Sequence, residues 1–269
     1  MILICVALAA ASATASSPGT VVVNLHITHH GGTNLCAFAR KHSHLATGSF
    51  ACFFTPAIWE DEKDASVGPF APSRQNEYFD AARSEGIGFV NWEYRYPPHI
   101  PIKSVEWEKS SLISILVVRD PIARLLSSAG LDKIRYGSDL PTRTDAQWRN
   151  YEHSGETDNY QLRIVAGCSR NVCDVDADTL ETAKVVARQI TYVIDLACLD
   201  ENMLELAKRL GWSWTPPKKK HHIYKSNAER VGNAARLRRL QKRNEFDIQF
   251  YKWAKTQSLV RCDDLPRVP

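Results

Sequence analysis

Runs of apolar residues alternate along the chain with segments of helical periodicity. Four short runs, rich in apolar and β-branched residues, predict strands at 20–27, 88–92, 112–118 and 191–196. Helical patterns predict helices at 33–41, from 121 onward, at 145–167, 178–189 and 200–211, and one long closing helix at 233–256. Because strands alternate with helices, we expect an α/β fold with a parallel sheet.

Capping residues predict several helix boundaries. Asp120 followed by Pro121 is typical of a helix N-terminus directly after a strand. The sequence Asp178–Glu181 has a capping-box pattern, and we expect Asp200 to cap the next helix and Gly211 to end it. The strand at 112–118 therefore passes through a short loop into a helix.

The composition is that of an ordinary globular protein. The chain has 269 residues, of which 44% are hydrophobic and 24% charged. These values exclude a disordered, collagen-like or coiled-coil chain, and the length fits one domain, expected at 20–262. The formal net charge of +4 is too small to indicate nucleic acid as the main partner.

The basic residues are concentrated in the segment 218–243. Ten of the 34 Lys and Arg residues lie there against a single acidic residue, Glu229, so the segment carries +9 and the remaining chain −5. A mildly acidic body with one basic segment favours a local anionic ligand. A solvated helix face is the alternative interpretation.

The N-terminal residues predict entry into the secretory pathway. An apolar run over residues 1–11 precedes Ala13–Ala15, which matches an A-x-A cleavage site, so we expect a signal peptide at 1–15. A buried first strand and a truncated membrane anchor are the alternatives, and any membrane association is expected only through this segment.

The cysteine count fits an oxidising compartment. Removal of Cys5 with the signal peptide leaves six of the seven cysteines, which permits up to three disulfides. Cys168 with Cys173 is the most favourable local pair, and Cys36 with Cys52 is a second.

The junction His26–Leu35 joins a predicted strand to a helix and is suited to binding an anion. Its Gly31-Gly32 turn allows backbone N–H groups to approach a ligand, and the helix N-terminus adds partial positive charge. Thr33 and Asn34 add side-chain donors.

A second junction begins where the strand at 112–118 ends. Arg119 stands at the carboxyl end of that strand, where open α/β sheets bind ligands. Ser127 lies eight residues further on, within the following helix. An arginine fork and a hydroxyl group in this arrangement can hold one phosphate.

Taken in order along the chain, these junctions resemble the sulfotransferase superfamily, whose members use 3′-phosphoadenosine 5′-phosphosulfate (PAPS). His26–Leu35 is similar to the family's 5′-phosphosulfate loop, and Arg119–Ser127 to its 3′-phosphate motif. Thr157–Gly167 and Asn244–Tyr251 resemble two helices of the carbohydrate, or Golgi-type, branch. The resemblance covers residues 21–255.

The resemblance implies a P-loop-like three-layer fold with a central parallel sheet flanked by helices. It also implies PAPS as cofactor, its desulfonated form (PAP) as product, and no metal. The implied cofactor contacts are His29, His30, Gly31, Gly32, Thr33, Asn34, Arg119, Ser127 and Lys220. Where the family's loop usually has lysine this chain has His29, whose charge would depend on pH.

Sulfuryl transfer requires a general base near the sulfur. Glu93, which follows the second predicted strand, is the candidate, because the family's base often comes from this region. His29 or His30 could serve instead, and His99 is a weaker option. The acceptor is expected to be a carbohydrate or another hydroxyl compound, and its expected contacts are Trp92, Asn159 and Arg163.

Other functions remain open at this point. A P-loop kinase-like enzyme is disfavoured because no Gly-Lys-Ser/Thr follows the first loop. A nucleotide-binding protein without catalysis is possible, in which His29 would mark lost chemistry. Zinc binding is disfavoured because the chain has no Cys-x-x-Cys or His-x3-His arrangement.

Overall fold

A computed structural model describes ten parts of the chain: residues 20–27, 29–42, 52, 75–93, 107, 111–131, 144–152, 157–168, 173–213 and 226–265. Lys220, His99 and the predicted signal peptide at 1–15 lie outside these described residues. For Thr33 and Glu93 the description is confined to the backbone.

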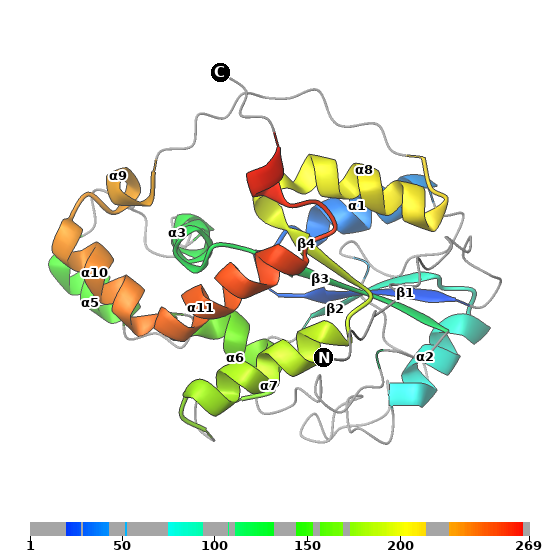
Figure 1. Cartoon of the computed structure of the whole chain (residues 1–269), viewed down its shortest axis with the longest axis horizontal. Coiled ribbons are helices and arrows are strands. Elements are labelled where there is room, and N and C mark those ends of the chain that lie inside the picture. Colours follow the sequence, from blue (N-terminus) through cyan, green and yellow to red (C-terminus); the bar gives the residue numbers. More distant parts are fainter. Residues whose placement is uncertain are drawn as a thin grey trace, which may run out of the picture.

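Four parallel strands form the sheet at the centre of the described residues (Figure 1). They are β1 (Val21–His26), β2 (Phe89–Glu93), β3 (Leu112–Val118) and β4 (Tyr192–Asp195), in the spatial order β2-β1-β3-β4. All four predicted strands are confirmed to within a residue or two at each end. Because β2 follows β1 on one side and β3 returns to its other side, the strand order reverses between β1 and β3.

Helices cover both faces of the sheet, as the α/β prediction requires (Figure 1). One face packs against α1 (Gly32–His42) and α8 (Leu199–Leu210). The other packs against α2 (Gln75–Ser84), α6 (Tyr160–Ala166), α7 (Ala177–Arg188) and α11 (Glu245–Ala254). Side chains alternate along β1, so Val22 faces the first layer while Val21 and Val23 face the second. The fold is a three-layer α/β architecture.

Four helices form a smaller lobe beside the sheet (Figure 1). They are α3 (Pro121–Leu131), α5 (Asp145–Glu152), α9 (Asn227–Val231) and α10 (Ala234–Arg243). Trp148 is 1% exposed at their centre, and the guanidinium of Arg236 stacks on its ring at 4.5 Å. The Tyr151 hydroxyl donates to the carbonyl of Leu125 at 2.7 Å, which ties α5 to α3.

The helix predicted at 145–167 is divided into α5 and α6, and α2 and α9 were not predicted. Three further helix boundaries differ from the prediction. The closing helix predicted at 233–256 is divided into α10 and α11 at Asn244, whose side-chain amide bonds to the carbonyl groups of Thr157 and Leu240. Asp176, not Asp178, caps α7, because its carboxylate accepts from the Thr179 N–H at 2.8 Å.

The third difference concerns α8. Asp200 lies within its first turn instead of capping it, because a short 3-10 turn, η6 (Leu196–Cys198), precedes the helix. Asp195 caps that turn by accepting from the Ala197 N–H at 3.0 Å. Gly211 ends α8 in the left-handed conformation, as predicted.

Three disulfides link the described residues: Cys36–Cys52, Cys168–Cys173 and Cys198–Cys262. The first two are the predicted pairs, and the third joins η6 to the short turn η8 (Cys262–Asp264) near the C-terminus. Disulfides persist in oxidising environments, so this chain belongs in a secreted or lumenal compartment. No described helix has the length and apolar character needed to span a bilayer.

Candidate functional site at the carboxyl edge of the sheet

The carboxyl ends of β1 and β3 lie side by side, because residues 21–25 of β1 pair with 112–116 of β3. The predicted junctions follow these two strands. In open α/β sheets the crevice for a ligand lies outside the carboxyl ends, where the strand order reverses. The structure therefore brings both predicted junctions to the position where this fold class binds ligands.

The loop between β1 and α1 is a tight turn with two left-handed residues. His29 has φ 68° and Gly31 has φ 79°. The His30 N–H donates to the carbonyl of Ile27 at 3.0 Å, and the Leu35 N–H donates to the carbonyl of Gly31 at 3.2 Å, which starts the helix. The Asn34 N–H also donates to the Gly31 carbonyl, at 2.9 Å. The N–H groups of Gly32 and Thr33 come before these first helical hydrogen bonds, so this end of α1 is suited to an anion.

Both glycines of this loop are required by close contacts. A Cβ at Gly31 would lie 2.9 Å from Cδ1 of Leu196, and its positive φ also disfavours any other residue. A Cβ at Gly32 would overlap the imidazole ring of His26. The loop therefore lies directly against the ends of β1 and β4.

Arg119 joins the second junction to the first. Its Nη1 donates to the carbonyl oxygen of His29 at 2.6 Å. Its backbone N–H donates to the Oε1 of Gln161 at 3.2 Å, and the same oxygen lies 2.7 Å from Nε2 of His30. The predicted phosphate-binding residues His29, His30 and Arg119 are thus held in one connected group.

The sequence analysis did not identify two buried asparagines that support this loop. The Nδ2 group of Asn24 in β1 donates to Oδ1 of Asn91 in β2 at 2.8 Å. The Nδ2 group of Asn91 in turn donates to the carbonyl of Gly32 at 3.2 Å and so fixes the start of α1. In the sequence, these asparagines could have been found as polar residues within two otherwise apolar strands.

The start of α3 contacts a residue within the basic segment 218–243. Asp120 caps α3 as predicted, by accepting from the Ala123 N–H at 2.7 Å. The same carboxylate oxygen accepts from Nδ2 of Asn227 at 3.1 Å. Residue 227 is therefore anchored beside Arg119, only seven positions after Lys220 in the sequence. Ser127 is half-buried on α3.

Glu93 ends β2, and its backbone pairs with His26 at the end of β1. The predicted base is therefore at the same edge of the sheet as the β1–α1 loop. The predicted alternative, His30, is 0% exposed. Because its Nε2 faces a carbonyl-type oxygen of Gln161, that nitrogen carries the proton and cannot accept another.

Trp92 differs from the predicted acceptor contact. Its side chain is 2% exposed, and its ring stacks on Tyr78 and meets the edge of Phe79 within the core. Trp107 packs against it at 5.4 Å between ring centroids. The aromatic ring is part of the layer between the sheet and α2, where other side chains cover it.

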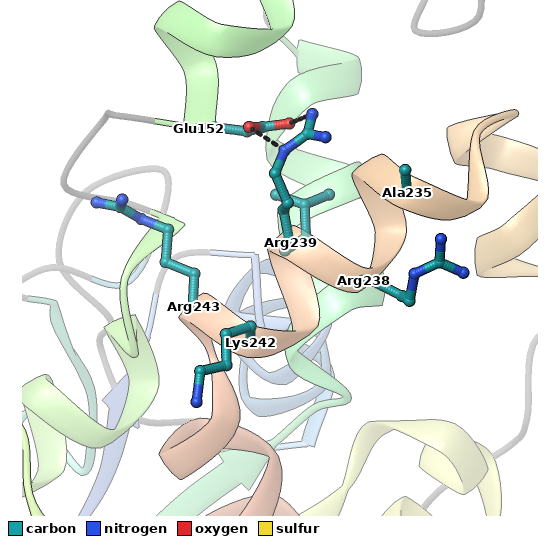
Figure 2. A pocket seen from close by; sticks show the side chains of 7 residues that line it. Glu152, Ala235, Arg238, Arg239, Lys242 and Arg243 are labelled. Carbon is teal, nitrogen blue, oxygen red and sulfur yellow. Dashed lines mark hydrogen bonds and ion pairs between the residues drawn. The ribbon is translucent and has the colours of Figure 1, made fainter.

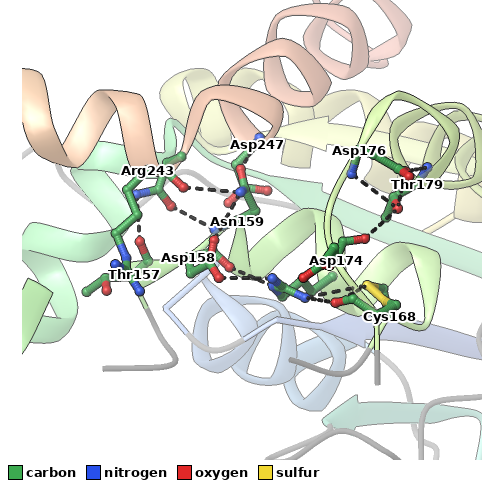
Figure 3. Close-up of polar contacts among 12 residues, drawn as sticks. Thr157, Asp158, Asn159, Cys168, Asp174, Asp176, Thr179, Arg243 and Asp247 are labelled. Carbon is green, nitrogen blue, oxygen red and sulfur yellow. Dashed lines mark hydrogen bonds and ion pairs between the residues drawn. A yellow bond between two sulfur atoms is a disulfide. The ribbon is translucent and has the colours of Figure 1, made fainter. Parts of the chain in front are cut away.

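Asn159 and Arg163 also differ from the predicted acceptor contacts, because both make polar contacts inside the fold. Figure 3 shows the contacts of Asn159. Asn159, at φ 47°, donates from Nδ2 to the carbonyl of Arg243 and accepts at Oδ1 from the Asp247 N–H. Arg163 is 6% exposed and forms an ion pair with Asp158 at 2.9 Å. These side chains hold α6 against α11 and the segment around Cys173.

Asp247, which lies in α11, holds the N-terminus of α6. Its carboxylate oxygens accept from the N–H groups of Leu162 at 2.6 Å and Gln161 at 3.2 Å. Burial raises the pKa of Asp247 to about 6, although these hydrogen bonds and the charge of Arg124 favour the ionised form. Arg124 is 1% exposed, and its guanidinium lies over the ring of Tyr160 at 4.2 Å.

A buried carboxylate also ends β4, beside the end of β3. Asp195 is 1% exposed and accepts from the Tyr251 hydroxyl at 3.1 Å. Burial raises the pKa of Asp195 above its ordinary value, against the effect of its hydrogen bonds with Ala197 and Tyr251. The Asp195 N–H donates to the Ser258 hydroxyl at 2.9 Å, which holds the C-terminal segment along this edge.

Part of the basic segment has a structural role in the lobe (Figure 2). A cavity of about 610 Å³ lies along α10, and Arg239 beside it forms a two-point contact with Glu152 at 3.0 and 3.1 Å. Figure 2 shows Arg238, Lys242 and Arg243 pointing in different directions from the helix. These residues do not converge on one ligand, so α10 fits the solvated-face interpretation.

No group of three or more His, Cys, Asp or Glu side chains suited to a metal occurs in the part of the chain that the structure describes. Comparison with family models, with curated proteins and with solved structures found no match.

Proposed function

We propose that the protein is a sulfotransferase that moves the sulfuryl group of PAPS to a hydroxyl group of a carbohydrate or other small acceptor. The observation that carries this proposal is the hydrogen bond from Arg119 to the carbonyl of His29. It joins the two junctions that the sequence pattern assigns to the two ends of one nucleotide. A nucleotide with a 5′-phosphosulfate and a 3′-phosphate requires two such anion-binding sites at one sheet edge.

The residues at this edge fit the two anionic ends of the nucleotide. The 5′-phosphosulfate would bind at the start of α1, where the N–H groups of Gly31, Gly32 and Thr33 and the helix dipole favour negative charge. Asn34 is exposed in the same turn. The 3′-phosphate would bind to the guanidinium of Arg119 and to the hydroxyl of Ser127.

PAPS supplies an activated sulfuryl group, and the protein supplies position and charge. A bond forms between the acceptor oxygen and sulfur as the bond from sulfur to the 5′-phosphate oxygen breaks. Glu93 would take the acceptor's proton, and the donors of the β1–α1 loop would stabilise the negative charge on the leaving phosphate. A protonated His29 would add to that stabilisation below its pKa.

The compartment of this reaction is proposed from the disulfides and the N-terminal sequence. Three disulfides require an oxidising environment. Together with the predicted signal peptide at 1–15, they favour the secretory pathway, and the resemblance to the carbohydrate branch favours the Golgi lumen.

Isothermal titration calorimetry with PAP and with ATP tests the nucleotide assignment. We expect PAP to bind at least tenfold more tightly than ATP, and Arg119→Ala to weaken PAP binding about tenfold or more, because a hydrogen bond to a charged group is lost. Arg238→Ala, a change on the exposed face of α10, is the matched control and should bind like the wild type. Equal affinity for PAP and ATP would refute the assignment.

Transfer of radiolabelled sulfate from PAPS to a panel of sugars and phenols tests the activity. Glu93→Gln should abolish turnover and leave PAP affinity unchanged, because the amide cannot take a proton. If the wild type binds PAP but transfers no sulfate to any acceptor, the protein is a nucleotide-binding relative without catalysis.

A further inference from the structure

A single buried amide contacts both junctions. Gln161, in the first turn of α6, is 0% exposed. Its Oε1 accepts from the Arg119 N–H at 3.2 Å and lies 2.7 Å from Nε2 of His30. These partners are 42 and 131 residues away in the sequence and belong to different loops. One oxygen atom therefore links the loops after β1 and β3, in addition to the direct hydrogen bond from Arg119 to His29.

The orientation of this amide follows from its partners. A backbone N–H can only donate, so the atom that faces Arg119 is the amide oxygen, and His30 must donate from Nε2 to the same oxygen. The other end of the amide, Nε2 of Gln161, is buried and has no hydrogen-bond partner in the structure. A buried donor without an acceptor is unfavourable, so such a donor beside the two junctions indicates an acceptor that comes with a ligand.

The backbone of Gln161 is fixed independently of its side chain. Its N–H donates to Asp247 Oδ2 at 3.2 Å, and the N–H of the next residue, Leu162, donates to Oδ1 at 2.6 Å. The side chain therefore extends from an anchored helix start, and its amide acts as a rigid spacer and not as a flexible surface group.

We propose that Gln161 is a positioning residue for an anionic ligand. Its oxygen holds His30 and Arg119 at a fixed separation, and its Nε2 group donates to a phosphate or sulfate oxygen bound between the two junctions. Because the amide is fully buried in the free protein, this contact requires the side chains that cover Nε2 to move as the ligand binds. The nature of the ligand as a nucleotide rests on the proposed function, whereas the link between the loops does not.

Three variants separate these roles in calorimetric titrations with pyrophosphate and with PAP. Gln161→Leu removes both the acceptor and the donor, so we expect affinity for both ligands to fall about tenfold or more. Gln161→Glu keeps an acceptor for His30 and Arg119 but replaces the donor with a negative charge, so it should weaken binding at least as much. Gln249→Glu makes the same change at an exposed position of α11 and should have no effect. Urea unfolding of each variant checks that the fold is retained.

Nitrogen-15 NMR of the histidine rings tests the link without a nucleotide. We expect Nε2 of His30 to carry a slowly exchanging proton in the free protein, to change shift when pyrophosphate binds, and to lose exchange protection in Gln161→Leu. An unchanged His30 signal in Gln161→Leu, or wild-type pyrophosphate affinity in both Gln161 variants, overturns the inference. Normal pyrophosphate binding and variant effects without preference for PAP over ATP would overturn the proposed function alone. Absence of any pyrophosphate or PAP binding by the wild type would overturn both.

Discussion

Replacement of glycine by alanine in a helix usually stabilises a protein, but we expect Gly32→Ala to destabilise this one. Gly32 is the first residue of α1, and it is not among the residues with positive φ. Alanine is normally the better helix former by about 1 kcal/mol, so the exchange would stabilise an unobstructed helix. Here the three heavy atoms nearest to the added Cβ all belong to the His26 ring, and all would lie within 2.6 Å of it.

The two effects can be weighed against each other. A side chain forced into a packed site costs about 1–3 kcal/mol, because neighbouring groups must move. This cost exceeds the helix-propensity gain, so we expect Gly32→Ala to lower the free energy of unfolding by about 1 kcal/mol. The displaced ring lies against the turn that we propose binds the 5′-phosphosulfate, so PAP affinity should fall as well.

Urea unfolding of four proteins tests this reasoning as a double-mutant cycle: the wild type, Gly32→Ala, His26→Ala and the double variant. Removal of the ring should convert Gly32→Ala from destabilising to neutral or stabilising, which gives a coupling energy of about 1–2 kcal/mol. Gly211→Ala is a useful comparison, since its φ is 67° but nothing lies within 4 Å of its Cβ position. If Gly32→Ala stabilises the protein with His26 in place, the close approach of ring and turn is wrong.

Two further perturbations test the framework. The pKa of Asp247 in the folded protein, about 6, exceeds its ordinary value of 3.8, so between these pH values the folded state keeps a proton that the unfolded state releases. The free energy of unfolding should therefore fall, on the order of 2–3 kcal/mol, as the pH rises from 4 to 6. Urea titrations of Asp247→Asn should lack this part of the pH dependence. If the free energy of unfolding depends on pH equally in both proteins, the raised pKa of Asp247 is wrong. Loss of the disulfide between Cys198 and Cys262, by Cys262→Ser, should lower the free energy of unfolding by about 2–4 kcal/mol, and an unchanged urea midpoint would show that the link carries no stability.

The sheet could be predicted from sequence because its strands carry a local signal. The strand Leu112–Val118 is almost entirely apolar, and its bounds agree with the prediction. The helix boundaries were harder, since they depend on contacts between distant segments. At Asn244, which divides the closing helix, the side chain donates to the carbonyl of Thr157, 87 residues earlier in the sequence.

The residues of the candidate site were likewise only partly predictable from the sequence. The two junctions were predictable because glycines, an arginine and a helix start follow strands directly in the sequence. The roles of Asn91 and Gln161 were not identified, because each acts through partners 42 to 131 residues away. Trp92 was misassigned because an aromatic residue near a ligand edge has the same local pattern whether it faces the acceptor or the core.

The reciprocal contacts between α6 and α11 have a consequence for how the protein matures during synthesis. The N-terminal turn of α6 is secured by Asp247, which is made 86 residues after Gln161. All four strands are therefore synthesised before Asp247, the residue that anchors α6 beside the two junctions. A chain that stops short of residue 247 contains every residue proposed to touch the nucleotide and still lacks the anchor that orders them. The edge that we propose binds the nucleotide therefore lacks this anchor until residue 247 has been made.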